Sequence, residues 1–216
     1  MSDSPAGVAD LLGVLAYAEL TAFLRLAEDA TRHAPSLADR AALGDLAATE
    51  YAHFRLLHDR IASLGIDPEE AMAPFVGPLD DWHTQTTPGD WPEALVKAYV
   101  GTGIALDFYR EAAAGVDAET RRLVDEVLAD EGRSQFAVER VGAAIKEDPT
   151  LSGRLALWAR RLVGESLSQG QHVAAARPEL AELLVEAAGE DIGRMFARLT
   201  EAHGRRMAAM GLTPGP

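Results

Sequence analysis

The first quarter of the chain contains a carboxylate and a histidine at a spacing that suits metal binding. In Glu50-Tyr51-Ala52-His53 the outer two residues lie one helical turn apart, so their side chains share a helix face. An earlier carboxylate, Glu19, occupies a similar place in the preceding predicted helix. Carboxylate oxygens and imidazole nitrogens are ligands that suit iron and manganese. Glu19, Glu50 and His53 are therefore candidate ligands of one divalent or ferrous ion.

Two predicted helices, roughly residues 7–33 and 36–64, must position these side chains. Glu19, Glu50 and His53 all fall on apolar stripes with spacings of three and four residues, which indicates burial. A turn centred between residues 34 and 35 leaves Glu19 and Glu50 equally distant from it, so an antiparallel pair places them at the same height. A buried carboxylate needs a proton, a partner or a metal. There are two alternatives. The three side chains could form a buried polar network, or the apolar stripe could be assigned one residue out of place, so that the carboxylates face solvent.

A matching half-site is expected from a second helical pair, and there the sequence is incomplete. Asp130 lies on the apolar stripe of the fourth predicted helix and is the fourth candidate metal ligand, with Glu131 as a weaker one in the other register. One turn after Asp130 stands Arg133 instead of a histidine, and the opposite helix offers Thr102 instead of a carboxylate. Arg133 is either exposed or points inward as a fixed positive charge that replaces a metal. No catalytic residue is assigned.

The composition of the chain and the positions of its turn residues favour an all-α fold. The chain has 216 residues, 48% of them hydrophobic, and few β-branched runs. Short turns join the two helices within each of two predicted hairpins, whereas the stretch 66–92 between the hairpins is rich in proline and glycine and reads as a long irregular connection. This is the pattern of a ferritin-like four-helix bundle with a long crossover and two additional C-terminal helices. We expect one domain over residues 1–210 and a disordered tail at 211–216. The predicted helices after the connection are roughly 92–114, 117–146, 151–176 and 178–210.

The net charge of the chain and its N-terminal sequence indicate which partners and which location to expect. A formal charge of −14 disfavours nucleic acid, whose phosphates attract basic surfaces. The sequence lacks an uninterrupted apolar stretch long enough for a membrane span, begins without the pattern of an export signal and has no cysteine. We therefore expect no membrane, a cytoplasmic location and a homodimer formed through the added helices. Asp107 and Glu111 are expected to face solvent or an added helix.

Several segments carry a resemblance to a known family. They are Ala18-Glu19, Ala48-Thr49-Glu50-Tyr51-Ala52-His53-Phe54, Lys97-Ala98-Tyr99-Val100-Gly101-Thr102-Gly103, Asp107-Phe108-Tyr109-Arg110-Glu111 and Leu157-Trp158-Ala159-Arg160-Arg161-Leu162-Val163-Gly164-Glu165. Over roughly residues 8–205 the chain resembles the ferritin-like family related to the di-iron hydroxylase that acts on methylthio-isopentenyl adenosine in tRNA, in its smaller actinobacterial branch. The resemblance implies a carboxylate and a Glu-x-x-His from each helical pair, with relatives carrying Asp at Thr102 and His at Arg133. It implies the same bundle without an intact di-iron centre.

Two hypotheses of function follow. The first is a non-catalytic or single-metal relative that keeps the bundle, with one iron or none, and with manganese as an alternative metal. The second is a metal-dependent oxidoreductase or hydroxylase that activates dioxygen against an unknown substrate. Iron storage is less favoured, because a cage-forming ferritin is a plain bundle with one short fifth helix.

Overall fold

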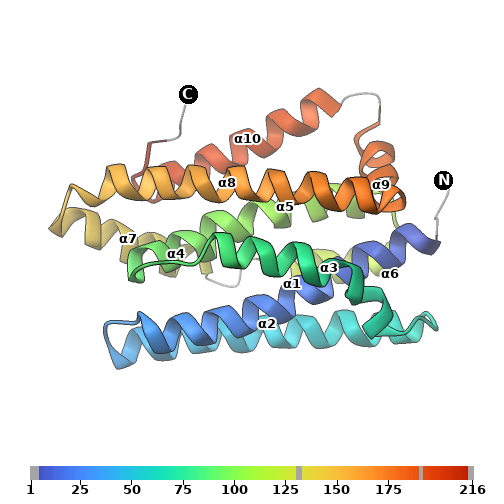
Figure 1. Cartoon of the computed structure of the whole chain (residues 1–216), viewed down its shortest axis with the longest axis horizontal. Helices are drawn as coiled ribbons and strands as arrows, with labels where there is room; N and C mark the ends of the chain where they lie inside the picture. The colour runs from blue at the N-terminus through green and yellow to red at the C-terminus, as the bar shows by residue number, and fades with distance from the viewer. Residues whose placement is uncertain (1–4, 130–132, 190–191, 214–216) are drawn as a thin grey trace.

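The structure is a computed structural model that describes residues 5–129, 133–189 and 192–213. Over these ranges every regular element is a helix, so the all-α prediction is confirmed. Figure 1 shows α1 and α2 side by side, α8 along the same long axis, and α9 at one end. The elements are α1 (Pro5–Arg32), α2 (Leu37–Ser63), α3 (Pro68–Gln85), α4 (Trp91–Val96), the π-helix η1 (Lys97–Gly101), α5 (Thr102–Ala113), α6 (Ala118–Val127), α7 (Arg133–Glu147), α8 (Leu151–Ala176), α9 (Pro178–Ala188) and α10 (Ile192–Ala209).

The α1–α2 hairpin forms as the sequence predicts. Pro35 keeps the chain extended between the helices, and the Ser36 side chain caps α2 by accepting a hydrogen bond from the backbone N–H of Asp39 at 3.0 Å. The Asp39 carboxylate also accepts a hydrogen bond from Arg140 of α7 at 2.6 Å. The cap therefore fixes the start of α2 and ties it to the second half of the bundle.

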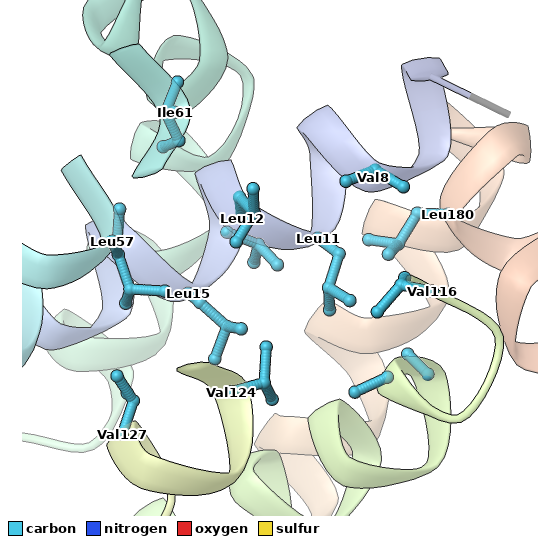
Figure 2. Packing of buried hydrophobic residues seen from close by; sticks show 14 of the residues in the cluster. Val8, Leu11, Leu12, Leu15, Leu57, Ile61, Val116, Val124, Val127 and Leu180 are labelled. Carbon is cyan, nitrogen blue, oxygen red and sulfur yellow. The ribbon is translucent and has the colours of Figure 1, made fainter. Parts of the chain in front are cut away.

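The main core lies at one end of this hairpin, where α1 meets α2, α5, α6 and α9. Leu11, Leu12 and Leu15 of α1 are fully buried. Figure 2 shows them beside Leu57 of α2 and Val124 of α6. A second apolar group, built around Leu26 and Leu43, packs the opposite end of the hairpin. The level of Glu19 and Glu50 falls between these two apolar groups.

The connection at 66–92 is helical, contrary to the prediction of an irregular stretch. Asp67 caps α3 by accepting from the backbone N–H of Glu69 at 2.8 Å, and Pro68 occupies the first turn, where proline is tolerated. Pro74 and Pro78 lie inside the helix. Capping and packing outweigh the helix-breaking tendency of these two prolines.

Close approach to α1 explains why α3 stays helical. A Cβ atom at Gly13 of α1 would lie 2.1 Å from the Ala71 carbonyl oxygen of α3, so only glycine allows this crossing. Phe75, one turn further along α3, is fully buried in the main core. The connection does pass along the bundle, and it does so as a packed helix.

The second hairpin departs from two straight helices. Its first arm is α4, η1 and α5 in direct succession, so one π-helical turn interrupts the α-helix just before Thr102. Its second arm, predicted as one helix over 117–146, is divided into α6, which ends at Val127, and α7, which begins at Arg133. The Leu128 carbonyl accepts a hydrogen bond from Arg110 of α5. Both departures fall near the level where the second half-site is expected.

The added helices cover the second hairpin. The predicted helix 178–210 is divided into α9 and α10, with Gly189 after α9 at a φ of 63°, which favours glycine. Asp107 and Glu111 of α5 pair with Arg206 and Arg198 of α10, so the expectation that they face an added helix is confirmed. The tail prediction is wrong at Leu212, which is buried against α10; residues 214–216 lie outside the described part of the chain.

Among the residues that the structure describes, one helix has the length and apolar composition that a membrane span requires. It is α1, and most of its apolar window is buried inside the bundle. The core helix of a soluble bundle passes the same test, so this property is weak evidence for a span.

Candidate metal centre

Glu19 of α1 and the Glu50–His53 pair of α2 come together inside the bundle, as their spacing predicts. The three residues are 4%, 2% and 4% exposed, and each offers a ligand atom within 4.8 Å of the others. His53 Nδ1 lies 3.5 Å from Glu19 Oε2 and 3.8 Å from Glu50 Oε2. The convergence is confirmed, whereas the role of these residues as metal ligands stays a prediction.

Burial and mutual contact set the protonation of this cluster. Burial, together with a hydrogen bond to Glu50, raises the pKa of Glu19 well above its usual range. Burial alone would lower the pKa of His53, but the two carboxylates outweigh it and raise that pKa to about 9. At neutral pH His53 of the metal-free cluster therefore carries a proton, and burial favours the protonated form of Glu19 as well. Protons thus supply positive charge that a bound metal ion could supply instead.

Two buried atoms of the cluster fit a metal ion better than they fit each other. Glu19 Oε2 and His53 Nδ1 are both inaccessible to solvent, and neither has a hydrogen-bond partner. Their separation of 3.5 Å is long for a hydrogen bond between charged groups. Buried polar atoms without partners are rare in folded proteins, and a missing ion is one accepted reason for them. The donor set and the missing partners are both consistent with a divalent cation.

Tyr109 of α5 is a neighbour of this cluster that the sequence reasoning did not assign. Burial raises the pKa of its hydroxyl, and the nearby charge of Glu19 raises it further. The phenol therefore stays protonated beside the carboxylate. Tyr109 stands seven residues after Thr102, two helical turns on and on the same face. This spacing to Thr102 is the sequence feature from which Tyr109 could have been assigned to the site.

The second half-site is only partly described. Asp130 and Glu131 lie outside the described residues, and so does the side chain of Arg133, although Arg133 begins α7. None of the roles predicted for these three residues is therefore tested. Thr102 faces the interior at the border of a cavity, where it offers a hydroxyl instead of a carboxylate.

The glycines beside Thr102 have identifiable packing roles. A Cβ atom on Gly101 would lie 3.2 Å from the ring of Trp82. A Cβ atom on Gly103 would lie 2.4 Å from Nε of Arg206, whose guanidinium pairs with Asp107. The absence of side chains at Gly101 of η1 and Gly103 of α5 thus lets residues of α3 and α10 pack closely against this segment.

A mainly apolar cavity of about 470 Å³ adjoins the cluster. Glu50, Thr102 and Tyr109 all border it, and most of the rest of its wall comes from apolar residues of α1, α5, α8 and α9. Its volume is in the range of small-molecule sites in proteins. The candidate metal centre is thus placed beside space for an apolar molecule.

Comparison with known proteins places the chain at the level of a fold family. A search of curated proteins gives no match. A family model described as a ferritin-like domain of actinomycetes matches residues 3–187, which includes both hairpins and the candidate metal centre. The match agrees with the helical architecture and confirms the ferritin-like prediction. The chain belongs to this actinomycete family of ferritin-like domains.

Proposed function

We propose that this protein binds one divalent metal ion, iron or manganese, through Glu19, Glu50 and His53. The observation that carries the proposal is the convergence of three buried ligand atoms within 4.8 Å of one another on two adjacent helices. Ferritin-like bundles build metal sites from inward-facing carboxylates and Glu-x-x-His pairs. The α1–α2 hairpin supplies one such half.

Charge balance supports a divalent ion. Two carboxylates and a neutral imidazole carry a total charge of −2, which one such cation neutralises inside a low-dielectric interior. Without a metal, the raised pKa values of Glu19 and His53 favour protons on the cluster, which offset its negative charge. Metal and protons therefore compete, and metal binding near neutral pH should release the proton of His53.

A single ion is favoured over a pair. A dinuclear centre needs carboxylates from all four arms of the bundle, and Thr102 stands where the third arm would supply one. The protein is therefore best described as a single-metal relative within the ferritin-like family, without di-iron oxygen chemistry.

A metal-dependent oxidoreductase is the second candidate, and the cavity is the observation that favours it. Glu50 belongs to the cluster and also borders the cavity, as Tyr109 does, so an apolar substrate in the cavity would lie beside the metal. A bound iron ion would supply redox chemistry with dioxygen there. The Glu50 and Glu19 carboxylates would hold the ion, while Tyr109 would contribute a protonated phenol to the wall of the cavity. The tRNA substrate of the resembling hydroxylase is disfavoured by the charge of −14.

Elemental analysis of protein expressed with iron and manganese tests the proposal. We expect close to one ion per chain in the wild type, and a loss of most of it in Glu19→Gln and His53→Gln. Glu126→Gln, which alters an exposed carboxylate of α6, is the matched control and should retain the metal. Equal metal content in all four proteins would contradict the proposal.

A gain-of-site variant tests the single-ion stoichiometry. The double change Thr102→Asp with Arg133→His places a carboxylate and an imidazole at the two positions where the second hairpin lacks them, and bound metal should rise towards two per chain. Two irons per chain in the unaltered protein, with the absorption of an oxo-bridged pair, would overturn the single-ion assignment. It would make the oxidoreductase the leading function.

A further inference from the structure

The cavity beside the candidate metal centre is elongated. Its wall follows α1 from Val14 to Asp29, a rise of about 22 Å along a helix axis. On the opposite side the wall follows η1 and α5 from Lys97 to Ala112. Asp29 and Lys97 interact electrostatically, so they mark one end, while Val14 and Ala112 belong to the main core at the other. The cavity therefore has a charged end and an apolar end.

Small side chains create this space. Along the middle of the cavity α1 contributes Ala18 and Ala22, and the facing arm contributes Ala98, Gly101 and Ala105. None of these five residues extends beyond a methyl group, so the two helices leave an unfilled channel between them. The channel of about 470 Å³ is in the size range of small-molecule sites, so it is large enough to hold an apolar ligand.

The charged end contains a buried cation with few partners. Lys97 is 6% exposed, and its Nζ donates one long hydrogen bond, of 3.4 Å, to the His83 carbonyl oxygen. The same atom lies 4.9 Å from the centre of the Trp82 ring. The carboxylate that acts on Lys97 most strongly, Asp29, does so through longer-range electrostatics. At least one ammonium hydrogen is thus left for a ligand.

Two neighbours of Lys97 add to this polar end. Nε1 of Trp82 is a buried donor without a hydrogen-bond partner, and Trp82 borders the cavity. Asp29 balances the charge of Lys97 at longer range, and Arg25 is already paired with Glu28 at 3.1 Å. Burial lowers the pKa of Lys97 to about 8, so the ammonium is still charged at neutral pH. A buried ammonium beside a free N–H donor is suited to an oxygen anion.

We propose that this cavity binds a long-chain carboxylic acid, with its carboxylate on Lys97 Nζ and Trp82 Nε1 and its hydrocarbon tail along the alanine-lined channel. The tail would end among Val14, Leu180 and Val185, which form the apolar end. An apolar tail gains from leaving water along this wall, and the head group would place an anion in direct contact with Lys97, whereas Asp29 acts on it only at longer range. The site does not require a metal, so it goes beyond the proposed function and can be tested separately.

Calorimetric titration of metal-free protein with three probes of equal length tests the proposal. The probes are dodecanoate, dodecanol and dodecylamine at pH 7 in the presence of a chelator. We expect one dodecanoate per chain, bound at least about tenfold more tightly than dodecanol, because a hydrogen bond to a charged group is at stake. Equal affinity for acid and alcohol, or tighter binding of the amine, would overturn the proposal.

Two variants assign the binding to this cavity. Lys97→Met keeps an unbranched side chain one atom shorter and removes the charge, so dodecanoate should lose its advantage while dodecanol affinity stays the same. Lys146→Met, which alters an exposed lysine of α7, is the matched control and should leave both affinities unchanged. Ala105→Phe should block both ligands, and its thermal unfolding shows whether it is folded. Retention of the acid preference in Lys97→Met would refute the assignment.

Discussion

The raised pKa of His53 makes the stability of the metal-free protein depend on pH in a specific direction. In the unfolded chain this imidazole titrates near 6.5, and in the folded cluster its pKa is about 9. The folded state therefore binds the proton more tightly than the unfolded state does. The stabilisation is fully present below pH 6.5 and is lost as the pH rises towards 9.

The size of this effect follows from the shift. One pKa unit corresponds to about 1.4 kcal/mol, so a rise from 6.5 to about 9 amounts to about 3 kcal/mol in the free energy of unfolding. Because His53 is only 4% exposed, solvent screening should reduce this value little. Other groups titrate in the same range, so the effect is isolated as a difference between two proteins.

The assay is denaturant unfolding of chelator-treated wild type and His53→Gln between pH 6 and pH 9.5. The stability advantage of the wild type should shrink by about 3 kcal/mol over this range. His58→Gln, a change at a partly exposed histidine of the same helix, is the control and should show no such trend. A wild-type advantage that stays constant or grows with pH would refute the proposed proton on His53.

Two further predictions concern the packing of α1 against α3 and the charge of Lys97. Gly13→Ala should destabilise the protein by about 1–3 kcal/mol in urea unfolding, because its new methyl group would meet the Ala71 carbonyl oxygen of α3 at 2.1 Å. Gly164→Ala has open space around it and should be neutral or stabilising, so equal losses in both variants would contradict the steric account. The lowered pKa of Lys97 means that the unfolded state binds its proton more tightly, so wild-type stability should gain about 3 kcal/mol from this residue between pH 8 and 10.5. Lys97→Met should lack that gain, and the same slope in both proteins would exclude it.

The first half-site was predictable from sequence because two independent regularities agree there. The apolar stripes of α1 and α2 place Glu19, Glu50 and His53 on buried faces, and the short turn fixes the register between the helices. A hairpin with a tight turn leaves little freedom in the relative height of its arms. Sequence spacing then becomes spatial proximity, as the 3.5 Å separation of Glu19 and His53 shows.

The stretch 66–92 was misread because its prolines dominate the local signal. Proline inside a helix costs a hydrogen bond, so Pro74 and Pro78 argued for irregular chain. The opposing evidence was present in the Asp67 cap and in the burial of Phe75, but burial against α1 depends on Gly13, which lies far away in sequence. A contact of this kind cannot be recognised from the local pattern.

The fourth predicted helix and the tail failed for a related reason. The apolar stripe continues through Val127 and Val141, and the local sequence marks the break between α6 and α7 only weakly, through Gly132. The Leu128 carbonyl is engaged by Arg110 of the preceding arm, which is a tertiary contact. Leu212 is likewise held by burial near the end of α10, although the sequence around it reads as a tail.

The π-helical turn from Lys97 to Gly101 sets the orientation of everything after it. A π-turn holds one residue more than an α-turn, and one residue corresponds to about 100° of rotation around a helix. Thr102, Asp107 and Glu111 therefore face directions that an uninterrupted helix would not give them. Deleting a single residue within this turn would rotate α5 as a rigid rod, turning its acidic side away from α10 and changing which residue borders the cavity. The direction in which α5 faces is thus set by one extra residue in a single turn.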